Sequence, residues 1–327
     1  MLVVPFAAQV VGVVWLTGYL SLQNGRDANY QLAKQLTNEL GNHLSVELKN
    51  YLDTPSHIAQ EVANEIEANR LSPQKLLSLK TYSLSQEYPL SSIGSKITWI
   101  DGNSAFSNPM NHQFPNKDSY TRAIAANRSI WSAIYPSENQ KSLSISLSRP
   151  IYVRDSRTLL GVVNIEKDLT SLNDFLYQKQ FGSTGQIFIM ERSGKMVAAS
   201  NAKTFKLVHG KATQLKAIHH PDPMIAETIK YIAQTNPEFN RISGDHLFHA
   251  RVGKESLFFK IFAHQDLSGL DWLVVLVVPE SVFMAETDQN TKVTIFLCSA
   301  ALLATIALGW LTASWLTQPI RRLSQAS

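Results

Sequence analysis

Residues 185–200 read GQIFIMERSGKMVAAS, and this stretch carries the pattern on which the fold depends. The apolar run QIFIM is followed by a charged pair, by the dipeptide Ser193-Gly194 and then by a second apolar run, MVAA. Two short apolar runs on either side of a glycine-containing turn are typical of a β-hairpin. The stretch therefore predicts two antiparallel strands joined by a tight turn.

The order of elements around this hairpin occurs twice in the chain, as an internal repeat. The first copy opens with the hairpin KITWIDGNSAF at 96–106 and continues with a short helix, DSYTRAIAANR. Three strands follow, SIWSAIY, SLSISLSRPIYV and LLGVVNIE, and a helix from Asp168 to Lys179 closes the copy. In the second copy the hairpin at 185–200 precedes helical segments over 212–219 and 224–234 and strands over 242–251, 257–263 and 271–278. Each copy predicts one antiparallel sheet, so the fold class is α+β.

A long helix precedes both copies. Leucines recur every four residues at 32, 36, 40, 44, 48 and 52, which gives a mostly one-sided apolar surface. The segment Asp53-Thr54-Pro55 interrupts the pattern, because proline lacks the amide proton that a helix needs. We expect one helix over 23–80 that is kinked or restarts near Pro55. Its apolar face either packs on its own domain or forms the seam of a homodimer, and both can hold on different faces.

Two long runs lack Asp, Glu, Lys and Arg, one from Met1 to Gly25 and one between Lys292 and Arg321. Each exceeds the roughly 20 residues that cross a bilayer, which predicts transmembrane helices over 1–22 and 292–316. The first apolar run is too long for a cleaved signal peptide, so an uncleaved anchor is favoured. Arg321 and Arg322 follow the second span directly, whereas Glu286 and Asp288 lie before it beside Lys292. This places the C-terminus in the cytoplasm and the central region outside it. The expected location is the cell inner membrane, multi-pass, with a central region that is periplasmic or extracellular.

Composition excludes several classes of function. Without Arg321 and Arg322 the chain has 28 basic and 26 acidic residues and no basic stripe, so no nucleic-acid partner is expected. The single cysteine, Cys298, lies in the second predicted span, which excludes a disulfide or a thiolate nucleophile outside the membrane. His246 and His249 lie on a predicted strand, where residues three apart face opposite sides. We expect no metal site, no cofactor and no catalytic residue in this chain.

Four stretches together resemble one family. The segment at 181–200 resembles the linker and opening hairpin of the membrane-proximal half of a double Cache domain, and 269–283 resembles the last strand and exit helix of that half. RPIYVRDSRTLLGVVNIEKDL at 149–169 resembles the last two strands of the distal half. LTQPIRRLSQAS at 316–327 resembles the start of a HAMP domain. The set is similar to the sensor half of bacterial transmembrane receptors.

The resemblance implies a domain organisation. Two PAS-like Cache modules would occupy 81–181 (membrane-distal) and 182–291 (membrane-proximal), and a HAMP domain would begin over 317–327. It also implies a parallel homodimer and a cytoplasmic output domain beyond Ser327. A sensor histidine kinase is the favoured output, with a nucleotide cyclase or a chemoreceptor as alternatives.

The resemblance also implies where a ligand would bind. In amino-acid-binding members, an Arg-x-Trp-Tyr group starts the short helix of the distal half, and a Tyr-x-Asp follows on the next strand. Here Lys117 stands in place of the Arg, Ser119 in place of the Trp, and Tyr120 matches. The next strand keeps the tyrosine as Tyr135 but has Ser137 in place of the Asp.

Glu166 stands where the family has an Asp on the last strand. A lysine can pair a ligand carboxylate and a glutamate can accept hydrogen bonds from an amine. The missing carboxylate and tryptophan favour a small molecule other than a standard amino acid, with a module that binds no ligand as the alternative. Trp131, Arg149 and Tyr152 are further candidates for the same pocket, with core packing as the alternative for the two aromatic residues and a solvent-facing position for Arg149.

Three function classes compete at this point. A receptor fragment would relay ligand binding to the cytoplasm, whereas an anchored binding protein would signal nothing. The proline and the basic segment after the second span favour the receptor, since a simple anchor needs neither. An extracytoplasmic enzyme lacks any convergent set of acid, base or metal ligands.

Overall fold

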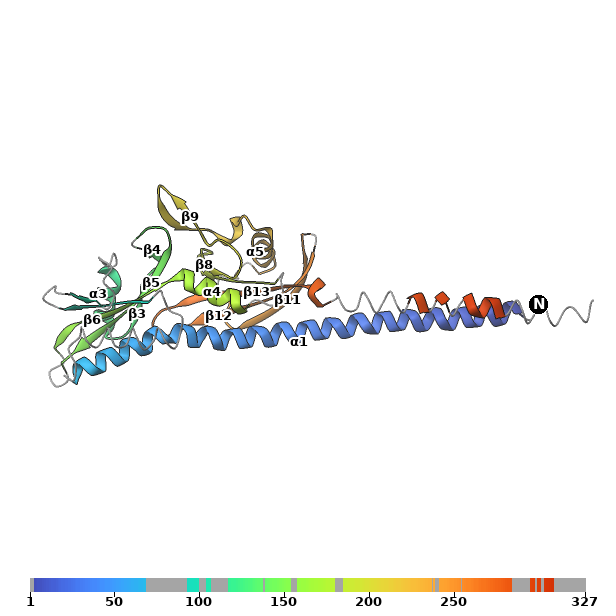
Figure 1. The fold of residues 1–327 in the computed structure, drawn as a ribbon, viewed down its shortest axis with the longest axis horizontal. Helices are drawn as coiled ribbons and strands as arrows, with labels where there is room; N and C mark the ends of the chain where they lie inside the picture. The colour runs from blue at the N-terminus through green and yellow to red at the C-terminus, as the bar shows by residue number, and fades with distance from the viewer. Residues whose placement is uncertain are drawn as a thin grey trace, which may run out of the picture. The chain divides into compact units, whose positions relative to one another are not determined.

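The computed structural model describes residues 3–68, 93–99, 104–106, 117–137, 139–153, 158–179, 185–236, 238, 241–253, 255–283, 295–297, 299–300 and 303–308. The chain divides into two compact units. One comprises Met1–Leu36 with Pro279–Ser327, and the other is Thr37–Val278. The second unit contains both sheets (Figure 1).

Helix α1, Val3–Glu67, runs without interruption through Pro55. The prediction of one long helix is borne out, and the helix does not restart near Pro55. The predicted continuation to residue 80 lies outside the described residues, which end at 68 in this part of the chain. Pro55 cannot donate to the carbonyl of Tyr51 four residues earlier. The ammonium of Lys167 lies 3.3 Å from that carbonyl oxygen and donates to it instead. A side chain from the sheet therefore satisfies the acceptor that the proline leaves free.

The leucine face of α1 packs within its own unit. Leu44, Leu48 and Leu52 are 4%, 0% and 3% exposed, whereas Leu32 is 51% exposed. Ile58 and others continue the buried face beyond Pro55. The reading in which the leucines pack on their own domain is therefore correct, and a dimer seam would need the opposite face of the helix.

The first sheet, at 93–168, has the strand order β2-β1-β6-β5-β3, with β4 paired to β5, and all described pairings are antiparallel. The hairpin predicted at 96–106 is present, with Lys96 opposite Phe106. Its elements are β1 (Ile93–Trp99), β2 (Ser104–Phe106), helix α3 (Lys117–Ala126), β3 (Ile130–Trp131), β4 (Tyr135–Pro136), β5 (Leu143–Tyr152) and β6 (Leu159–Asp168).

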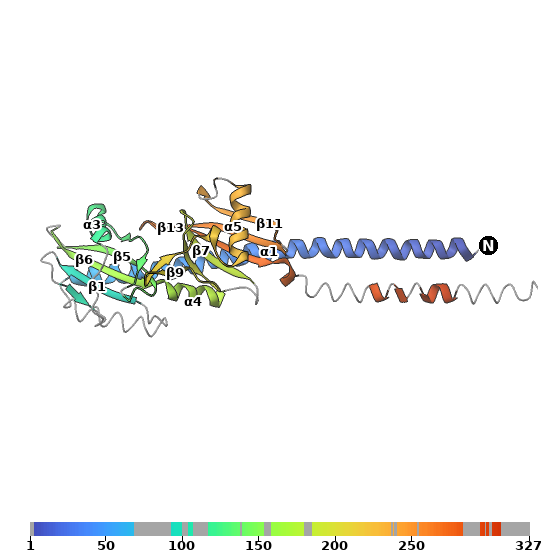
Figure 2. The ribbon, with the colours of Figure 1, turned by 90° about the horizontal axis from the view of Figure 1, so that it is seen from above.

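Helix α4, Leu169–Lys179, leads from the first sheet to the second (Figure 2). The second sheet has the order β11-β12-β13-β7-β8, so the predicted repeat of one antiparallel sheet per copy is confirmed. Gly194 has φ 78° in the turn of the hairpin at 185–200, a conformation that glycine adopts without steric cost. The strands are β7 (Gln186–Glu191), β8 (Met196–Ala199), β11 (Asp245–Val252), β12 (Glu255–Gln265) and β13 (Asp271–Pro279).

The helix predicted over 212–219 is wrong. The structure has a hairpin there, β9 (Phe205–Val208) paired with β10 (Lys211–Gln214), followed by a single 3₁₀ turn at Ala217–His219. His209 and Gly210 both have positive φ, 50° and 80°. Two consecutive residues with positive φ form the tight turn that matches the twist of paired strands. The His-Gly dipeptide is the signal that the helical reading missed.

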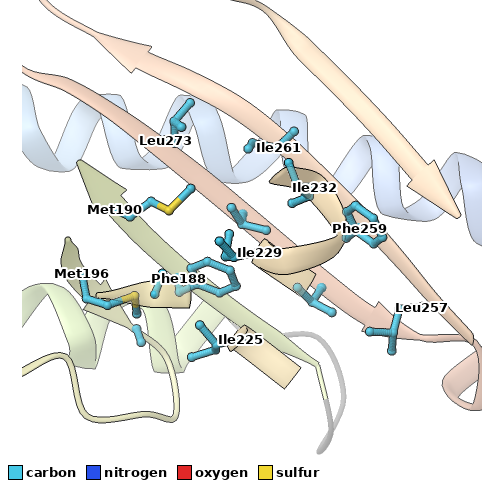
Figure 3. Close-up of a cluster of buried hydrophobic side chains, with 14 of the residues drawn as sticks. Phe188, Met190, Met196, Ile225, Ile229, Ile232, Leu257, Phe259, Ile261 and Leu273 are labelled. Carbon is cyan, nitrogen blue, oxygen red and sulfur yellow. The ribbon is translucent and has the colours of Figure 1, made fainter. Parts of the chain in front are cut away.

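One face of the second sheet carries a closed apolar core (Figure 3). Helix α5, Pro223–Thr235, lays Ile225, Ile229 and Ile232 against it, at the spacing that puts three side chains on one face of a helix. Asp222 caps the helix, because its carboxylate accepts from the Met224 amide at 2.9 Å. Aliphatic and aromatic side chains occupy this face, so it offers a small molecule few polar groups.

Within the part of the chain that the structure describes, no helix combines the length and the apolar character needed to span a bilayer. The spans predicted over 1–22 and 292–316 therefore stay predictions. The HAMP start at 317–327 and Cys298 lie outside the described residues.

Candidate functional site

The first sheet has one face of polar side chains and one apolar face. Along β5 the serines at 144, 146 and 148 alternate with Ile145 and Leu147, and all five are buried. Since successive side chains on a strand point to opposite faces, the three serines share one face. On the neighbouring strand β6, Asn164 lies opposite Ser148 and Glu166 lies opposite Ser146. These residues form the polar face of the module that contains the first sheet, which we call the distal module after its predicted position.

Helix α3 is fastened to this polar face at its first turn. The Ser148 hydroxyl donates to the Asn164 side-chain oxygen at 2.7 Å and lies 3.0 Å from the Ser119 hydroxyl. Ser119, Ser148 and Asn164 are 1%, 0% and 5% exposed. Ser119 therefore serves as an anchor of α3, at the position where the family pattern has a tryptophan.

Next to this network lies a cluster of three polar groups, Tyr135, Ser146 and Glu166. The Tyr135 and Ser146 hydroxyls are buried and make no hydrogen bond of good geometry among the described residues, although Ser146 and Glu166 both lie close enough to the Tyr135 hydroxyl to interact with it. Burial, and then the neighbouring Glu166 carboxylate, raise the pKa of Tyr135 well above its usual range, so the phenol stays protonated. Buried polar groups in proteins are normally satisfied, and each exception calls for an explanation. Two hydroxyls beside a carboxylate can receive and donate hydrogen bonds to a small polar molecule.

The turn between β4 and β5 uses the serine that replaces the family aspartate. The Ser137 hydroxyl donates to Asn139 at 2.6 Å and lies 2.8 Å from the Ser142 hydroxyl, which lies 2.7 Å from Asp168. Ser137 therefore holds the turn.

Of the predicted site residues, the structure brings Tyr135 and Glu166 together. Tyr120 is half-buried on α3, directly after the anchor Ser119. Lys117 is the first residue of α3, and its side chain lies outside the described part of the structure.

Trp131, Arg149 and Tyr152 make contacts away from this cluster. The Trp131 indole donates to Asp266 of the second module at 2.8 Å. Arg149 donates to Ser129 at 3.1 Å, and burial lowers its pKa, although nearby Glu67 acts in the opposite direction. The backbone of Tyr152 donates to Glu67 at the end of α1, at 3.2 Å. Strand positions explain two of these, because Arg149 belongs to the same alternating set as Ile145 and Leu147, and Trp131 lies opposite Leu147.

The sequence reasoning missed Ser146, Ser148 and Asn164. The signal is the stretch SLSISLS at 142–148, in which serine and aliphatic residues alternate strictly. Strict alternation predicts that all the serines share one face of the strand.

Metal ligands do not converge within the described residues, where no group of three His, Cys, Asp or Glu side chains could hold an ion. His246 and His249 lie on β11, as predicted, and each ring stacks on a phenylalanine. The His249 ring stacks on Phe258 with centroids 4.3 Å apart, and the His246 ring lies 6.3 Å from Phe248.

Two similar sheet modules behind one long N-terminal helix define a class of sensor domain. Residues 26–287 match the family model described as the Cache domain, in its double form dCache_1. The chain belongs to the Cache domain family.

Solved structures agree with this fold. The ligand-binding domain of the Campylobacter jejuni chemoreceptor Tlp3, in complex with 4-methylisoleucine, matches with a TM-score of 0.55 and 13% identity over 78% of this chain and 94% of that one. The ligand-binding domain of the Pseudomonas aeruginosa amino acid chemoreceptor PctC, in complex with GABA, matches with a TM-score of 0.51 and 18% identity over 75% and 99%. No curated protein sequence matches the chain.

Proposed function

We propose that this chain is the ligand-sensing part of a membrane-anchored bacterial receptor, and that its distal module binds a small molecule bearing an ammonium group. The observation that carries the proposal is the cluster of Tyr135, Ser146 and Glu166, in which two buried hydroxyls that make no well-formed hydrogen bond among the described residues lie beside a carboxylate. A carboxylate and neutral hydroxyls together suit a cationic donor better than an anion. The polar face of Ser119, Ser148 and Asn164 continues this surface.

The solved structures of similar fold support the ligand class. Tlp3 holds 4-methylisoleucine and PctC holds GABA, and each of these ligands carries an amino group. Ser119 and Ser137 replace the Trp and Asp of the amino-acid-binding pattern, so the proposal does not require an α-amino acid. A simple amine or an ω-amino acid fits the same cluster.

Anchoring in the membrane belongs to the proposal. The two runs without charged side chains, 1–25 and 293–320, are the support for two transmembrane helices. Arg321 and Arg322 directly after the second run support a cytoplasmic C-terminus and a periplasmic sensor in the inner membrane. The proposal also includes a homodimer in which the two copies of α1 lie at the centre.

The cytoplasmic part of the proposal is a relay. A HAMP domain beginning at 317–327 would pass the signal to an output domain, which we propose to be a histidine kinase. Two packings of a helical bundle with similar free energies would allow small movements of the spans to change the output.

A thermal-shift screen of the full chain in nanodiscs tests the ligand class. The panel contains amines, ω-amino acids, α-amino acids, organic acids and purines. We expect at least one ammonium-bearing compound to raise the melting temperature, since a ligand at 100 times its Kd adds about 2.7 kcal/mol of stability. Stabilisation by organic acids or purines alone would contradict the proposed ligand class, and a flat response across the panel would contradict ligand sensing by this module.

A further inference from the structure

The two Cache modules are joined by a contact between two turns. Trp131, which is 3% exposed, donates its backbone amide to the Ser268 carbonyl at 2.9 Å and its indole N–H to Asp266 at 2.8 Å. The guanidinium of Arg128 donates to the carbonyl of Leu267. Three consecutive residues of the turn between β12 and β13 thus accept hydrogen bonds from one short segment of the distal module.

The accepting turn is itself held rigidly by Asp266. Its Oδ2 accepts the hydrogen bond from the Trp131 indole N–H, while its Oδ1 accepts a hydrogen bond from the Leu270 amide at 2.7 Å. Its backbone amide donates to the Leu270 carbonyl at 3.2 Å, and Gly269 supplies the φ of 101° that closes the turn. One carboxylate therefore ties Trp131 to both ends of the β12–β13 turn.

The donating segment is a direct continuation of α3. Only residues 127–129 separate the helix from β3. Two backbone hydrogen bonds close the helix end: the Asn127 amide donates to the Ile124 carbonyl at 3.2 Å, and the Arg128 amide donates to the Ala123 carbonyl at 3.4 Å. The other end of α3 carries Ser119, which is fastened to the polar face of the distal module. A shift of α3 on that face would therefore move Arg128 and Trp131, which donate hydrogen bonds to the second module.

On the receiving side, the turn opens directly into β13. This strand lies in the middle of its sheet between β12 and β7, and it is buried from Trp272 to Pro279. A central, fully packed strand moves with its whole sheet and does not bend locally.

We infer that this contact, Arg128 and Trp131 with residues 266–268, is the coupling joint between the two modules. We call it the inter-module clasp. Trp131 and Asp266 are positioning residues that pass a movement of α3 to the β12–β13 hairpin. The signalling meaning of this coupling rests on the proposed function, whereas the mechanical coupling itself does not.

The test compares hydrogen–deuterium exchange in four forms of the full chain in nanodiscs, without added ligand. Ser148→Ala loosens the start of α3, and Trp131→Phe removes the indole donor but keeps an aromatic ring. The other two forms are the wild type and the double variant. We expect Ser148→Ala to raise the hydrogen–deuterium exchange rate over residues 257–279 by about threefold or more. A change of this size is consistent with the free energy that one hydrogen bond contributes to stability. In the Trp131→Phe background the same substitution should add clearly less than in the wild type, because the indole bond to Asp266 is lost while the backbone bond to Ser268 and the Arg128 bond to Leu267 remain.

Asp266→Asn provides a second way to open the clasp, since it keeps the Oδ1 acceptor for Leu270. The matched control is Asn173→Ala, which removes a different contact between the modules, the bond from the Ala199 amide to Asn173 at 2.9 Å. In that control the effect of Ser148→Ala on residues 257–279 should persist in full. Additive effects of Ser148→Ala and Trp131→Phe, or an unchanged hairpin in Ser148→Ala, would overturn the inference.

Failure of this test is distinct from failure of the proposed function. The exchange experiment needs no ligand. If the exchange effects are coupled but the chain binds no ammonium compound, the inference about the clasp stands and only its role in sensing is contradicted. Conversely, a ligand-binding chain with additive exchange effects would place the coupling elsewhere.

Discussion

At the scale of single residues, the most unusual side chains are two lysines buried against α1. Lys167 and Lys260 are each 1% exposed, although an isolated buried ammonium is costly. Lys260 is paired with Asp245 at 2.9 Å and bonded to Asn42 at 2.6 Å, and a Cβ on Gly41 would collide with its stem. Lys167 instead donates to Tyr51 and lies over its ring, 3.3 Å from the centroid. Each module therefore reaches α1 with a buried lysine, and within the described residues only Lys260 of the two is paired with a carboxylate.

The buried Lys167 predicts a pH dependence of stability. Burial lowers the pKa of Lys167 from 10.5 to about 7 in the folded chain. Between these values the unfolded chain binds more protons, so the free energy of unfolding should rise with pH from about 7 to about 10.5, by up to about 1.4 kcal/mol per pH unit. Above that range the buried Tyr51, whose pKa is raised to about 12, acts in the opposite direction.

Urea unfolding at several pH values measures this dependence. Lys167→Met should flatten the rise, because methionine fills the space without a titrating group. Lys230→Met, at an exposed position on α5, should keep the wild-type slope. A wild-type curve that is flat over this range, or an unchanged slope in Lys167→Met, would show that Lys167 does not titrate as described.

The candidate site shows how far single residues could be predicted. Tyr135 and Glu166 were found from the family pattern, because a strand position fixes which face a side chain takes. The part that Ser146 plays in the cluster could not be predicted from the family pattern, because serine is common and the burial of its hydroxyl depends on the neighbouring strands. Trp131 was a pocket candidate with core packing as the alternative, and the structure buries it. Its bond to Asp266, 135 residues away in sequence, could not be predicted from a local pattern.

At the scale of elements, the helix and strand patterns were reliable wherever the period was clear. Both sheets, α3, α4, α5 and β11 follow from the sequence. The hairpin of β9 and β10 does not, because its strands have only four residues each and its turn lacks the usual Asn-Gly or Asp-Gly pair. The continuity of α1 through Pro55 depends on a lysine supplied by another element, which no local pattern reveals.

The two faces of α1 predict a cross-linking pattern for the proposed dimer. Leu44, Leu48 and Leu52 face the sheets, whereas His43, Val46 and Asn50 are exposed. Single cysteines at the three exposed positions, in a Cys298→Ser background, should cross-link with a membrane-impermeant bis-maleimide on intact cells. Cysteines at the three buried leucines should not.

Each departure from this pattern contradicts a different part of the proposal. Equal cross-linking at buried and exposed positions would contradict the described helix face. Cross-linking only after permeabilisation would contradict a periplasmic sensor, and none under either condition would contradict a dimer centred on α1.

At the scale of the whole molecule, the two modules have the same architecture but different interiors. The distal module presents buried serines, Asn164 and Glu166 on one face of its sheet. The corresponding layer of the proximal module is filled by an apolar core that includes Ile229 and Phe259. This difference favours ligand binding in the distal module and transmission in the proximal one, with the inter-module clasp between them.

The most direct test of ligand sensing is a calorimetric titration of the full chain with the ammonium compound that stabilises it most. We predict saturable binding that weakens by about tenfold or more in Glu166→Gln, equivalent to at least about 1.4 kcal/mol, and also weakens in Tyr135→Phe. Glu238→Gln, an exposed glutamate of the proximal module, should bind as the wild type does. Equal affinity in the wild type, Glu166→Gln and Tyr135→Phe would contradict the assignment of the site to the distal module.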